Sequence, residues 1–408
     1  MPLIQNENIG FPCLEINQIN DILTATFNIH KIVSSKFLYS CQDQNIKLEA
    51  QLSVNSPTKF YFVKIVNLYL YDDSFENERL VHVCLDKFLN FLSEGDQKVV
   101  VVQKTIASKV VENIPVTIIT QDGNITDPKQ IKNLPCLIKL AEWLPGNDIG
   151  QLGIMPDNEN FNEIGHMTRM LHNKAREFAS LDEHLSAEPN YLKAVEPRKI
   201  EWDMEDWYLA EAENVEKVLK DDQEIGLLIK KTMSEFEQGV KILRNEQAEN
   251  ADFSGFQKII VHHDLNTENV LAEKNDTTCK ITIKGIIDYL DLVFRPAIYD
   301  LAILISYWIN DTAMPQYNLS DEKTKQLMID QTKSILKGYD FESMGGDFKF
   351  TLEKLLLPAV KARMCQSICK SYEMLALHPE YAEKTRKDML VRKRTVRILS
   401  DLDVYDFI

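Results

Sequence analysis

The N-terminal third of the chain combines short apolar stretches with polar turns, a pattern that predicts β-strands. The polar residues 41–44 separate Phe37–Ser40 from Asn45–Ala50, so these two stretches are expected to form a β-hairpin. The next apolar stretch, Lys59–Val66, predicts a further strand and carries Lys64 among its apolar residues. A lysine in such a run usually keeps a sheet edge soluble or extends out of the sheet.

The rest of this region predicts helices and more strands. Apolar residues between 80 and 92 recur on one face, which indicates a helix after the Lys64 strand, and a shorter helix is predicted near Ile16–Thr24. Strands are expected at 98–103, 116–120 and 136–140, with a turn at 121–124. The segment Leu140–Gly146 ends in Pro-Gly, which favours a hinge between two lobes.

Beyond this segment apolar residues recur every three to four positions, which is typical of helices. This period begins near Phe161, continues through residues 211–246 and returns in the tail from 320 to 399. The 408 residues are enough for two lobes with separate cores. We therefore predict an α+β protein, with a small antiparallel sheet in residues 1–141 and a mainly helical lobe in residues 142–408.

One stretch of the helical lobe predicts strands with polar residues at their ends. The apolar runs 259–261, 269–272 and 281–287 place Asp264 and Asn269 on a short segment, and Asp288 after the last run. Phosphoryl transfer needs a carboxylate that accepts a proton from the attacking hydroxyl, and oxygen ligands for Mg²⁺. Asp264 suits the first role, and Asn269 and Asp288 suit the second. The alternative is that these residues only serve turns and helix caps.

The order of these residues resembles a known catalytic signature. H-H-D-L-N-T-E-N-V-L followed by I-I-D-Y-L-D is similar to the signature of the aminoglycoside phosphotransferase and choline kinase-like superfamily, whose members are relatives of protein kinases. Within it, Q-D-Q-N at 42–45, L-P-G at 144–146 and R-M-C-Q-S at 363–367 resemble the hydroxylysine kinase family. His263 and Leu290 depart from the pattern, because the family usually or often has glycine there, so the local backbone geometry can differ.

The resemblance implies a bilobal protein-kinase-like fold and a small-molecule kinase. Such an enzyme would transfer the γ-phosphoryl group of GTP or ATP, with Mg²⁺, to a hydroxyl group of 5-hydroxy-L-lysine in lysine degradation. The alternatives are another small alcohol as acceptor, such as an aminoglycoside, choline, homoserine or a thiosugar, and an inactive kinase-like scaffold.

The resemblance also implies roles for individual residues. Lys64 would bind the donor phosphates and pair with a carboxylate of the following helix, for which Glu76, Glu78 and Asp86 are the candidates. The hairpin and hinge positions imply a nucleotide site that includes Ser40, Gln44, Asn45, Leu140 and Glu142.

Asp264 would be the catalytic base, and the candidate substrate-binding residues are Asp291, Arg363 and Asn266. Arg363 is expected on an apolar helix, where it needs a carboxylate partner. That partner is either an internal acid or the carboxylate of the substrate.

Composition and charge narrow the possible partners. The net charge of −16 argues against a general nucleic-acid surface and favours a small cationic substrate. The acidic segment 202–209, with two tryptophans, either lines such a site or packs as a helix. Seven scattered cysteines, the lack of a secretory signal and the absence of 18 uninterrupted apolar residues predict a cytoplasmic protein without membrane contacts. Oligomeric state stays open.

Overall fold

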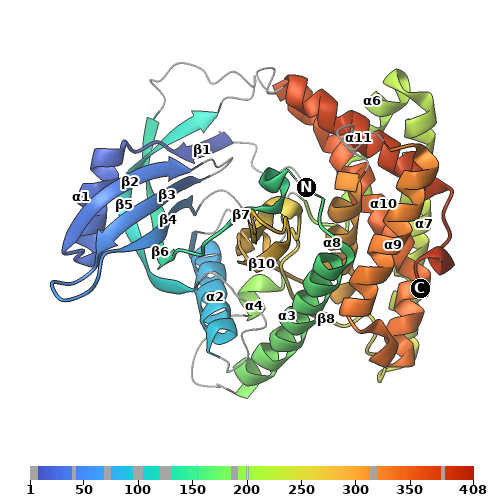
Figure 1. The fold of residues 1–408 in the computed structure, drawn as a ribbon, viewed down its shortest axis with the longest axis horizontal. Coiled ribbons are helices and arrows are strands. Elements are labelled where there is room, and N and C mark those ends of the chain that lie inside the picture. Colours follow the sequence, from blue (N-terminus) through green and yellow to red (C-terminus); the bar gives the residue numbers. More distant parts are fainter. Residues whose placement is uncertain are drawn as a thin grey trace. The chain divides into compact units, whose positions relative to one another are not determined.

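The computed structural model describes residues 8–38, 43–68, 75–94, 104–119, 131–153, 155–184, 192–198, 200, 202–312, 319–377 and 382–408. Contacts within the chain divide it into two compact units. Unit 1 comprises the described residues within Met1–Asp96, Val102–Leu144 and Tyr191–Ala194, and unit 2 comprises those within Gln97–Val101, Pro145–Asn190 and Val195–Ile408. Figure 1 shows the elements of both units along the chain.

Unit 1 is built on an antiparallel sheet. Its described strands are β1 (Asn8–Pro12), β2 (Lys31–Leu38), β3 (Gln44–Gln51), β4 (Lys59–Asn67), β5 (Thr105–Ile119) and β6 (Ile131–Glu142), in the order β1-β5-β6-β4-β3-β2. The predicted hairpin is confirmed, because β2 pairs with β3 antiparallel, although residues 39–42 of its turn lie outside the described residues. The predicted strand 98–103 and turn 121–124 also lie outside them, and β5 and β6 are longer than predicted.

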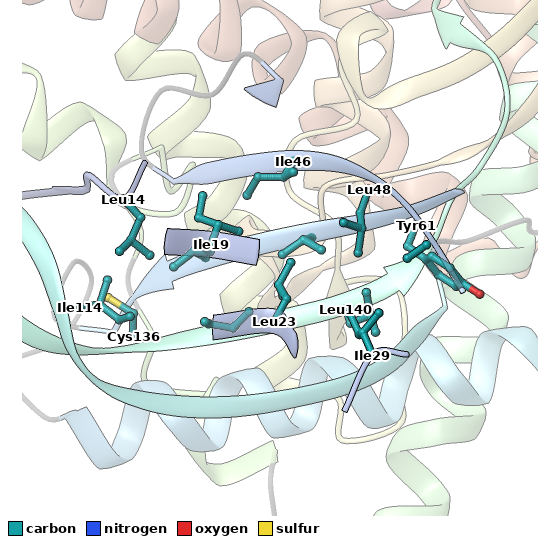
Figure 2. Packing of buried hydrophobic residues seen from close by; sticks show 14 of the residues in the cluster. Leu14, Ile19, Leu23, Ile29, Ile46, Leu48, Tyr61, Ile114, Cys136 and Leu140 are labelled. Atoms are coloured by element: carbon teal, nitrogen blue, oxygen red, sulfur yellow. The ribbon is translucent and has the colours of Figure 1, made fainter. Parts of the chain in front are cut away.

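Helix α1 (Ile16–Phe27) covers one face of this sheet. Ile19 and Leu23 of the helix share an apolar cluster with Ile46, Val63 and Leu140 of three neighbouring strands, and Figure 2 shows the packing. Because side chains alternate between the two faces of a strand, the residues next to these point away from α1. The other face of the sheet therefore carries the polar residues of the central strands.

Those polar residues form a row across the sheet. Asn45 of β3 lies opposite Lys64 of β4, and Lys64 lies opposite Lys139 of β6. Helix α2 (Phe75–Ser93), which confirms the predicted helix, is tied to this face, since Asp86 accepts a hydrogen bond from Lys139 at 2.9 Å. The small unit thus has an apolar face beneath α1 and a charged face towards α2.

Unit 2 is mainly helical. Its described helices are α3 (Asn158–His184), α5 (Trp207–Ala210), α6 (Ala212–Asp221), α7 (Gln223–Glu249), α8 (Ala297–Thr312), α9 (Asp321–Gly338), α10 (Gly346–Leu377) and α11 (Ala382–Ser400), and the short helix α4 (Leu192–Val195) lies where the two units meet along the chain. The predicted run 211–246 is two helices rather than one. The break occurs at Asp222, whose side chain caps α7 by accepting a hydrogen bond from the backbone of Ile225.

Two glycines allow α3 and α9 to pack closely. A Cβ atom added to Gly165 would collide with the backbone carbonyl of Ile335, and one added to Gly338 would collide with that of Asn162. Helix α8 is buried along most of its length, which agrees with its nearly continuous apolar sequence. These helices enclose the core on which the short strands of unit 2 rest.

Helix α11 carries basic residues that pair with carboxylates of other elements. Lys393 contacts Asp222, Arg394 contacts Asp321 and Arg397 contacts Glu224. Neighbouring elements therefore supply carboxylates to three basic residues of α11. None of the described helices is long and apolar enough to cross a membrane.

The antiparallel sheet of unit 1 and the mainly helical unit 2 confirm the predicted α+β, bilobal fold. The short strands of unit 2 are β7 (Asn147–Asp148), β8 (Lys258–Val261), β9 (Val270–Lys274), β10 (Ile281–Ile286) and β11 (Val293–Pro296). They form a three-stranded sheet, β10-β9-β7, and a two-stranded sheet, β11-β8. The loops between these strands carry the predicted site.

Candidate active site

The loop between β8 and β9 is shaped by the short helix η2 (Thr267–Asn269). Asn266 caps this helix, because its side-chain oxygen accepts hydrogen bonds from the backbone of Glu268 at 2.8 Å and of Asn269 at 3.0 Å. An asparagine before a short turn is well suited to this role. The cap holds Asn269 at a fixed distance from the start of the loop.

Asp264 and Asn269 are in direct contact within this loop. The Asn269 side-chain nitrogen donates to the backbone oxygen of Asp264 at 2.8 Å and to its carboxylate Oδ2 at 2.9 Å. Asn266 donates to the same Oδ2 at 2.9 Å. The structure therefore brings together three of the residues that the sequence singled out, and two amides fix one oxygen of the Asp264 carboxylate.

Asp288 and Asp291 follow β10 and lie close enough to Asp264 to affect its ionisation. Burial raises the pKa of Asp264, the Arg363 guanidinium opposes this, and the charge of Asp288 adds to the rise. Burial, together with the charges of Asp264 and Asp288, raises the pKa of Asp291 to about 7. The backbone of Ile287 donates to that of Asn269 at 2.9 Å, so the two loops are joined directly.

Asp300 anchors the start of the Asp264 loop from α8. Its carboxylate accepts hydrogen bonds from the backbone nitrogens of His262 at 2.9 Å and His263 at 2.6 Å. It also contacts His172 of α3 at 3.1 Å, and the other ring nitrogen of His172 lies 2.7 Å from the hydroxyl of Tyr339.

The histidines before Asp264 have distinct roles. Nε2 of His262 lies 2.8 Å from the backbone oxygen of Ile287, and its Nδ1 accepts a hydrogen bond from the backbone of Asp264 at 3.3 Å, which defines the tautomer. His263 has φ 65°, in the left-handed region that favours glycine. Where the family usually has glycine, this residue therefore keeps a glycine-like backbone conformation. Leu290, the second departure, lies in the short helix η3 (Tyr289–Asp291).

Arg363 of α10 pairs with an internal acid. One of its terminal nitrogens lies 3.2 Å from Oδ1 of Asp264, and the side chain is buried. The sequence left two possible partners for Arg363, an internal acid and the carboxylate of the substrate. The structure shows an internal acid, Asp264, in contact with the guanidinium. The predicted base and one predicted substrate-binding residue are thus in contact with one another.

The acidic segment 202–209 is held by cations of the same unit. Asp203 pairs with Arg295 at 2.5 Å, and Glu205 contacts Arg244 at 2.9 Å. Trp207 is buried and packs edge-on against Phe236. This segment therefore packs as a structural element, which was one of its two interpretations, and its two acids at 203 and 205 are balanced by arginines.

In unit 1, Lys64 pairs with Asp43, at 3.2 Å, and both side chains are buried. Asp43, an acid of the hairpin turn, is therefore one partner of Lys64 that the sequence did not predict. The pairing with an acid of the following helix stays a prediction. Of the helix candidates, Asp86 bonds to Lys139, Glu76 pairs with Arg79, and the buried Glu78 lies 3.5 Å from His82.

The other predicted nucleotide residues have diverse environments in unit 1. Gln44 exchanges two hydrogen bonds with the backbone of Leu14, at 2.9 and 3.0 Å, so its amide holds the N-terminal segment. Leu140 points into the apolar cluster beneath α1, and Glu142 is exposed at the end of β6. Ser40 lies outside the described residues. Of the predicted nucleotide residues that the structure describes, Asn45 shares the face of the sheet that carries Lys64.

Comparison with known proteins agrees with this geometry. The model of the phosphotransferase enzyme family matches residues 124–320, a segment that contains Asp264, Asn269, Asp288 and Asp291. Over this segment the chain is similar to that family, and the protein is a phosphotransferase.

Individual relatives of this phosphotransferase are distant. The chain is 25% identical over 316 residues to hydroxylysine kinase of Xenopus laevis. The aligned region covers 76% of this chain and 73% of that protein. A choline kinase from Cryptosporidium parvum has the same fold, with a TM-score of 0.50 at 15% identity, covering 95% of this chain and 97% of that one. The match to an ethanolamine kinase of Plasmodium vivax covers 93% of this chain and 89% of that chain, with a TM-score of 0.46 at 11% identity.

Asn269 and Asp288, which were predicted to bind Mg²⁺, offer an amide oxygen and carboxylate oxygens, which are the atom types that a hard cation prefers. No group of three His, Cys, Asp or Glu side chains suited to a metal is found in the part of the chain that the structure describes. The predicted set differs from such a group, since it combines the amide of Asn269 with the carboxylate of Asp288. The nitrogen of Asn269 is bound to Asp264, which leaves its oxygen as the atom able to bind a hard cation.

Sequence reasoning missed several residues of this phosphotransferase. Asp43 and Lys139 belong to buried ion pairs, and Tyr307 lies against Arg363. A signal was present for Lys139, because it stands in the apolar run 136–140 just as Lys64 stands in its own strand. Asp43 lies within the motif Q-D-Q-N at 42–45, although its pairing with Lys64 was not predicted. No comparable signal marks Tyr307, whose role depends on what packs against it.

Proposed function

We propose that this protein transfers the γ-phosphoryl group of GTP or ATP to a hydroxyl group of a small amino-acid-like molecule, with 5-hydroxy-L-lysine as the first candidate. The observation that carries the proposal is the contact of Asp264 with Asn269, beside the carboxylates of Asp288 and Asp291. The similarity to hydroxylysine kinase of Xenopus laevis supports the choice of acceptor.

In this proposal Asp264 accepts the proton of the acceptor hydroxyl as its oxygen attacks the γ-phosphorus. The amides of Asn266 and Asn269 hold one oxygen of the carboxylate, so it keeps a constant orientation. Positioned proton transfer of this kind typically contributes a factor of about 10² to 10⁴ to the rate. Lys64 of unit 1 binds the donor phosphates, in keeping with its place on the polar face of the sheet.

Asn269, through its side-chain oxygen, and Asp288 are the proposed ligands of Mg²⁺. When bound, the ion would offset the negative charge of the donor phosphates. Burial raises the pKa values of Asp264 and Asp291 most, and the charges of neighbouring carboxylates add to the rise, so the acids of this site lie close together. Such a set of acids is stabilised by a cation.

Asp291 is the proposed partner for an ammonium group of the acceptor. Burial and neighbouring acids raise its pKa to about 7, and an ammonium group nearby would favour its charged form. Asp203 and Glu205, the other acids considered for this role, already pair with Arg295 and Arg244. The proposal therefore places recognition of the amine at Asp291.

The alternative of an inactive scaffold rested on His263 and Leu290 and on the unplaced partner of Lys64. His263 takes the backbone conformation that glycine favours, and its nitrogen bonds to Asp300. Lys64 has a carboxylate partner in Asp43. These observations favour an intact site over a degenerate one.

A phosphorylation screen tests the proposal. The purified protein is incubated with Mg²⁺ and either ATP or GTP, together with 5-hydroxylysine, choline, ethanolamine, homoserine, an aminoglycoside or a thiosugar. We expect transfer to 5-hydroxylysine above the others, and its loss in Asp264→Asn. Preferential transfer to another alcohol would identify that compound as the acceptor in place of 5-hydroxylysine. Nucleotide binding without transfer to any compound would support the alternative of an inactive kinase-like scaffold.

A further inference from the structure

Arg363 is enclosed by groups of the protein itself. It lies in the middle of α10 with 1% of its surface exposed. One terminal nitrogen donates to the backbone oxygen of Trp202 at 2.8 Å and to the side chain of Gln366 at 3.0 Å. The guanidinium also lies 5.1 Å from the ring centre of Trp202 and 5.4 Å from that of Tyr307. An arginine in this setting is poorly placed to receive the carboxylate of an incoming molecule.

The second terminal nitrogen of Arg363 completes the support of Asp264. It binds Oδ1 at 3.2 Å, while the amides of Asn266 and Asn269 bind Oδ2. The two asparagines belong to the same loop as Asp264 and move with it, whereas Arg363 lies 99 positions later, on a long buried helix. Arg363 therefore supplies a contact that ties the carboxylate to the helical core.

The charge and shape of arginine suit this role. Its planar group can bind a carboxylate, a carbonyl and an amide at the same time, and a lysine cannot reproduce that fork. Each carboxylate oxygen of Asp264 has two lone pairs, so the contacts with Arg363 and the two asparagines leave room for an acceptor hydroxyl. Misplacing a reacting group by about 1 Å can lower a rate about 10²-fold.

We propose that Arg363 is a positioning residue, which orients Asp264 towards the acceptor hydroxyl and does not bind the carboxylate of the acceptor. The inference rests on the proposed function, in which Asp264 takes the proton of that hydroxyl. Arg363 would then act through Asp264 and not as a ligand of the substrate.

Two acceptors separate these roles of Arg363. Turnover number and KM are measured for 5-hydroxylysine and for its decarboxylated amine, with wild type, Arg363→Met and Arg363→Lys. We expect Arg363→Met to lower kcat about 100-fold for both acceptors, with little change in KM or in the Kd for the Mg²⁺-nucleotide complex. Arg363→Lys should recover part of the loss, because it keeps a cation near Asp264. A rise in KM confined to the acceptor with a carboxylate would overturn the inference.

Lys361→Met is the matched control. Lys361 lies on the same helix, is buried, and its nitrogen is 2.8 Å from Glu235, so its removal also breaks a buried pair. We expect lower thermal stability in this variant with kcat near that of wild type. An equal loss of kcat in Lys361→Met would show that general destabilisation explains the effect. If Arg363→Met does not fold, Arg363→Lys against the same control decides between the two explanations.

Failure of the proposed function is recognised separately. If wild type phosphorylates neither acceptor, hydrolysis of the nucleotide with water as acceptor gives the rate to compare. In that assay, Arg363→Met combined with Asp264→Asn should be no slower than Asp264→Asn alone, because the arginine acts through the aspartate. Independent, additive losses would overturn the positioning role, whichever acceptor the protein uses.

Discussion

Asn269 binds Asp264 twice through one side-chain nitrogen, at 2.8 Å to the backbone oxygen and 2.9 Å to the carboxylate. Because both contacts lie within one short loop, the distance between the proposed base and a proposed metal ligand is determined locally. The two groups remain chemically different, since the carboxylate can take a proton and the amide oxygen cannot do so near neutral pH. Substitutions can therefore separate proton transfer from metal binding.

Replacing Asp264 by asparagine should affect chemistry far more than nucleotide binding. The variant keeps a polar side chain of similar size but loses the proton acceptor, so we expect turnover to fall by about 100-fold or more. The Kd for Mg²⁺ and a non-hydrolysable nucleotide should change little, which calorimetric titration measures beside the turnover rate. Loss of metal-dependent binding in this variant would contradict the assignment of Asp264 as base.

Asp288→Asn, in contrast, should weaken Mg²⁺-dependent nucleotide binding as well as turnover. It removes a negative charge from a hard cation, so Mg²⁺-dependent nucleotide binding should weaken and turnover should fall with it. The measurement is the nucleotide Kd at several Mg²⁺ concentrations. Unchanged metal dependence in Asp288→Asn would move the ligand role elsewhere among the acids of this site.

The buried pair of Lys64 and Asp43 predicts two separable effects. Lys64→Ala should reduce turnover through loss of phosphate binding, and should also destabilise unit 1 because it removes a buried partner of Asp43, at 3.2 Å. Breaking such a pair from one side costs about 3 to 5 kcal/mol. The double variant Lys64→Ala, Asp43→Asn should regain stability without regaining activity. Full activity of Lys64→Ala with either donor would leave Lys64 as a purely structural residue.

Asp300 predicts a dependence of stability on pH. Burial alone would raise its pKa, but the hydrogen bond from His172 and the nearby histidines hold the pKa below its ordinary value. The unfolded chain therefore takes up a proton at Asp300 before the folded protein does, and the stability it contributes is lost as pH falls below about 4. Asp300→Asn should lower the free energy of unfolding by about 3 kcal/mol at pH 7 and flatten its decline at acid pH.

Urea unfolding of wild type and Asp300→Asn at pH 7 and at about pH 3 measures this prediction. The exposed Asp276 provides a control, since Asp276→Asn removes a carboxylate without a buried network. Equal acid sensitivity of wild type and Asp300→Asn would mean that other carboxylates govern the acid transition.

The crossing of α3 and α9 predicts a cost for adding a single methyl group. In Gly165→Ala the new Cβ would meet the backbone of Ile335, so the helices must separate, at a cost of about 1 to 3 kcal/mol. Gly345→Ala is the control, because a Cβ there meets no atom within 4 Å. Thermal unfolding of the two variants should differ, and similar midpoints would show that the crossing can relax.

Removal of the side-chain amine from the acceptor tests the proposed role of Asp291. An analogue of 5-hydroxylysine without that amine should have a substantially higher KM, because a partly buried carboxylate attracts an ammonium group strongly. Asp291→Asn should reduce the difference between the two compounds. Equal KM values of wild type for both compounds would show that Asp291 does not recognise the charge of the amine.

Much of this architecture follows from local sequence. Alternating apolar residues marked β3 and β4, and the helical period marked α2 and α3, because backbone hydrogen bonds and the burial of one face depend on neighbours a few positions away. The break between α6 and α7 was not predicted, since Asp222 becomes a cap only when the helices turn apart. Within the site, the spacing from Asp264 to Asn269 determined their contact, which the cap at Asn266 maintains.

The partners of the buried charges were decided by tertiary structure alone. Lys64 pairs with Asp43 of the hairpin turn. Arg363 pairs with Asp264, which lies 99 positions earlier in the sequence. A buried charge must be neutralised by whatever carboxylate the packing brings near it, and that depends on how whole elements meet. By itself the sequence determined the loop that holds Asp264, Asn266 and Asn269. The long-range packing of α10 and α8 decided what supports that loop, because those contacts join segments whose spacing along the chain carries no local signal.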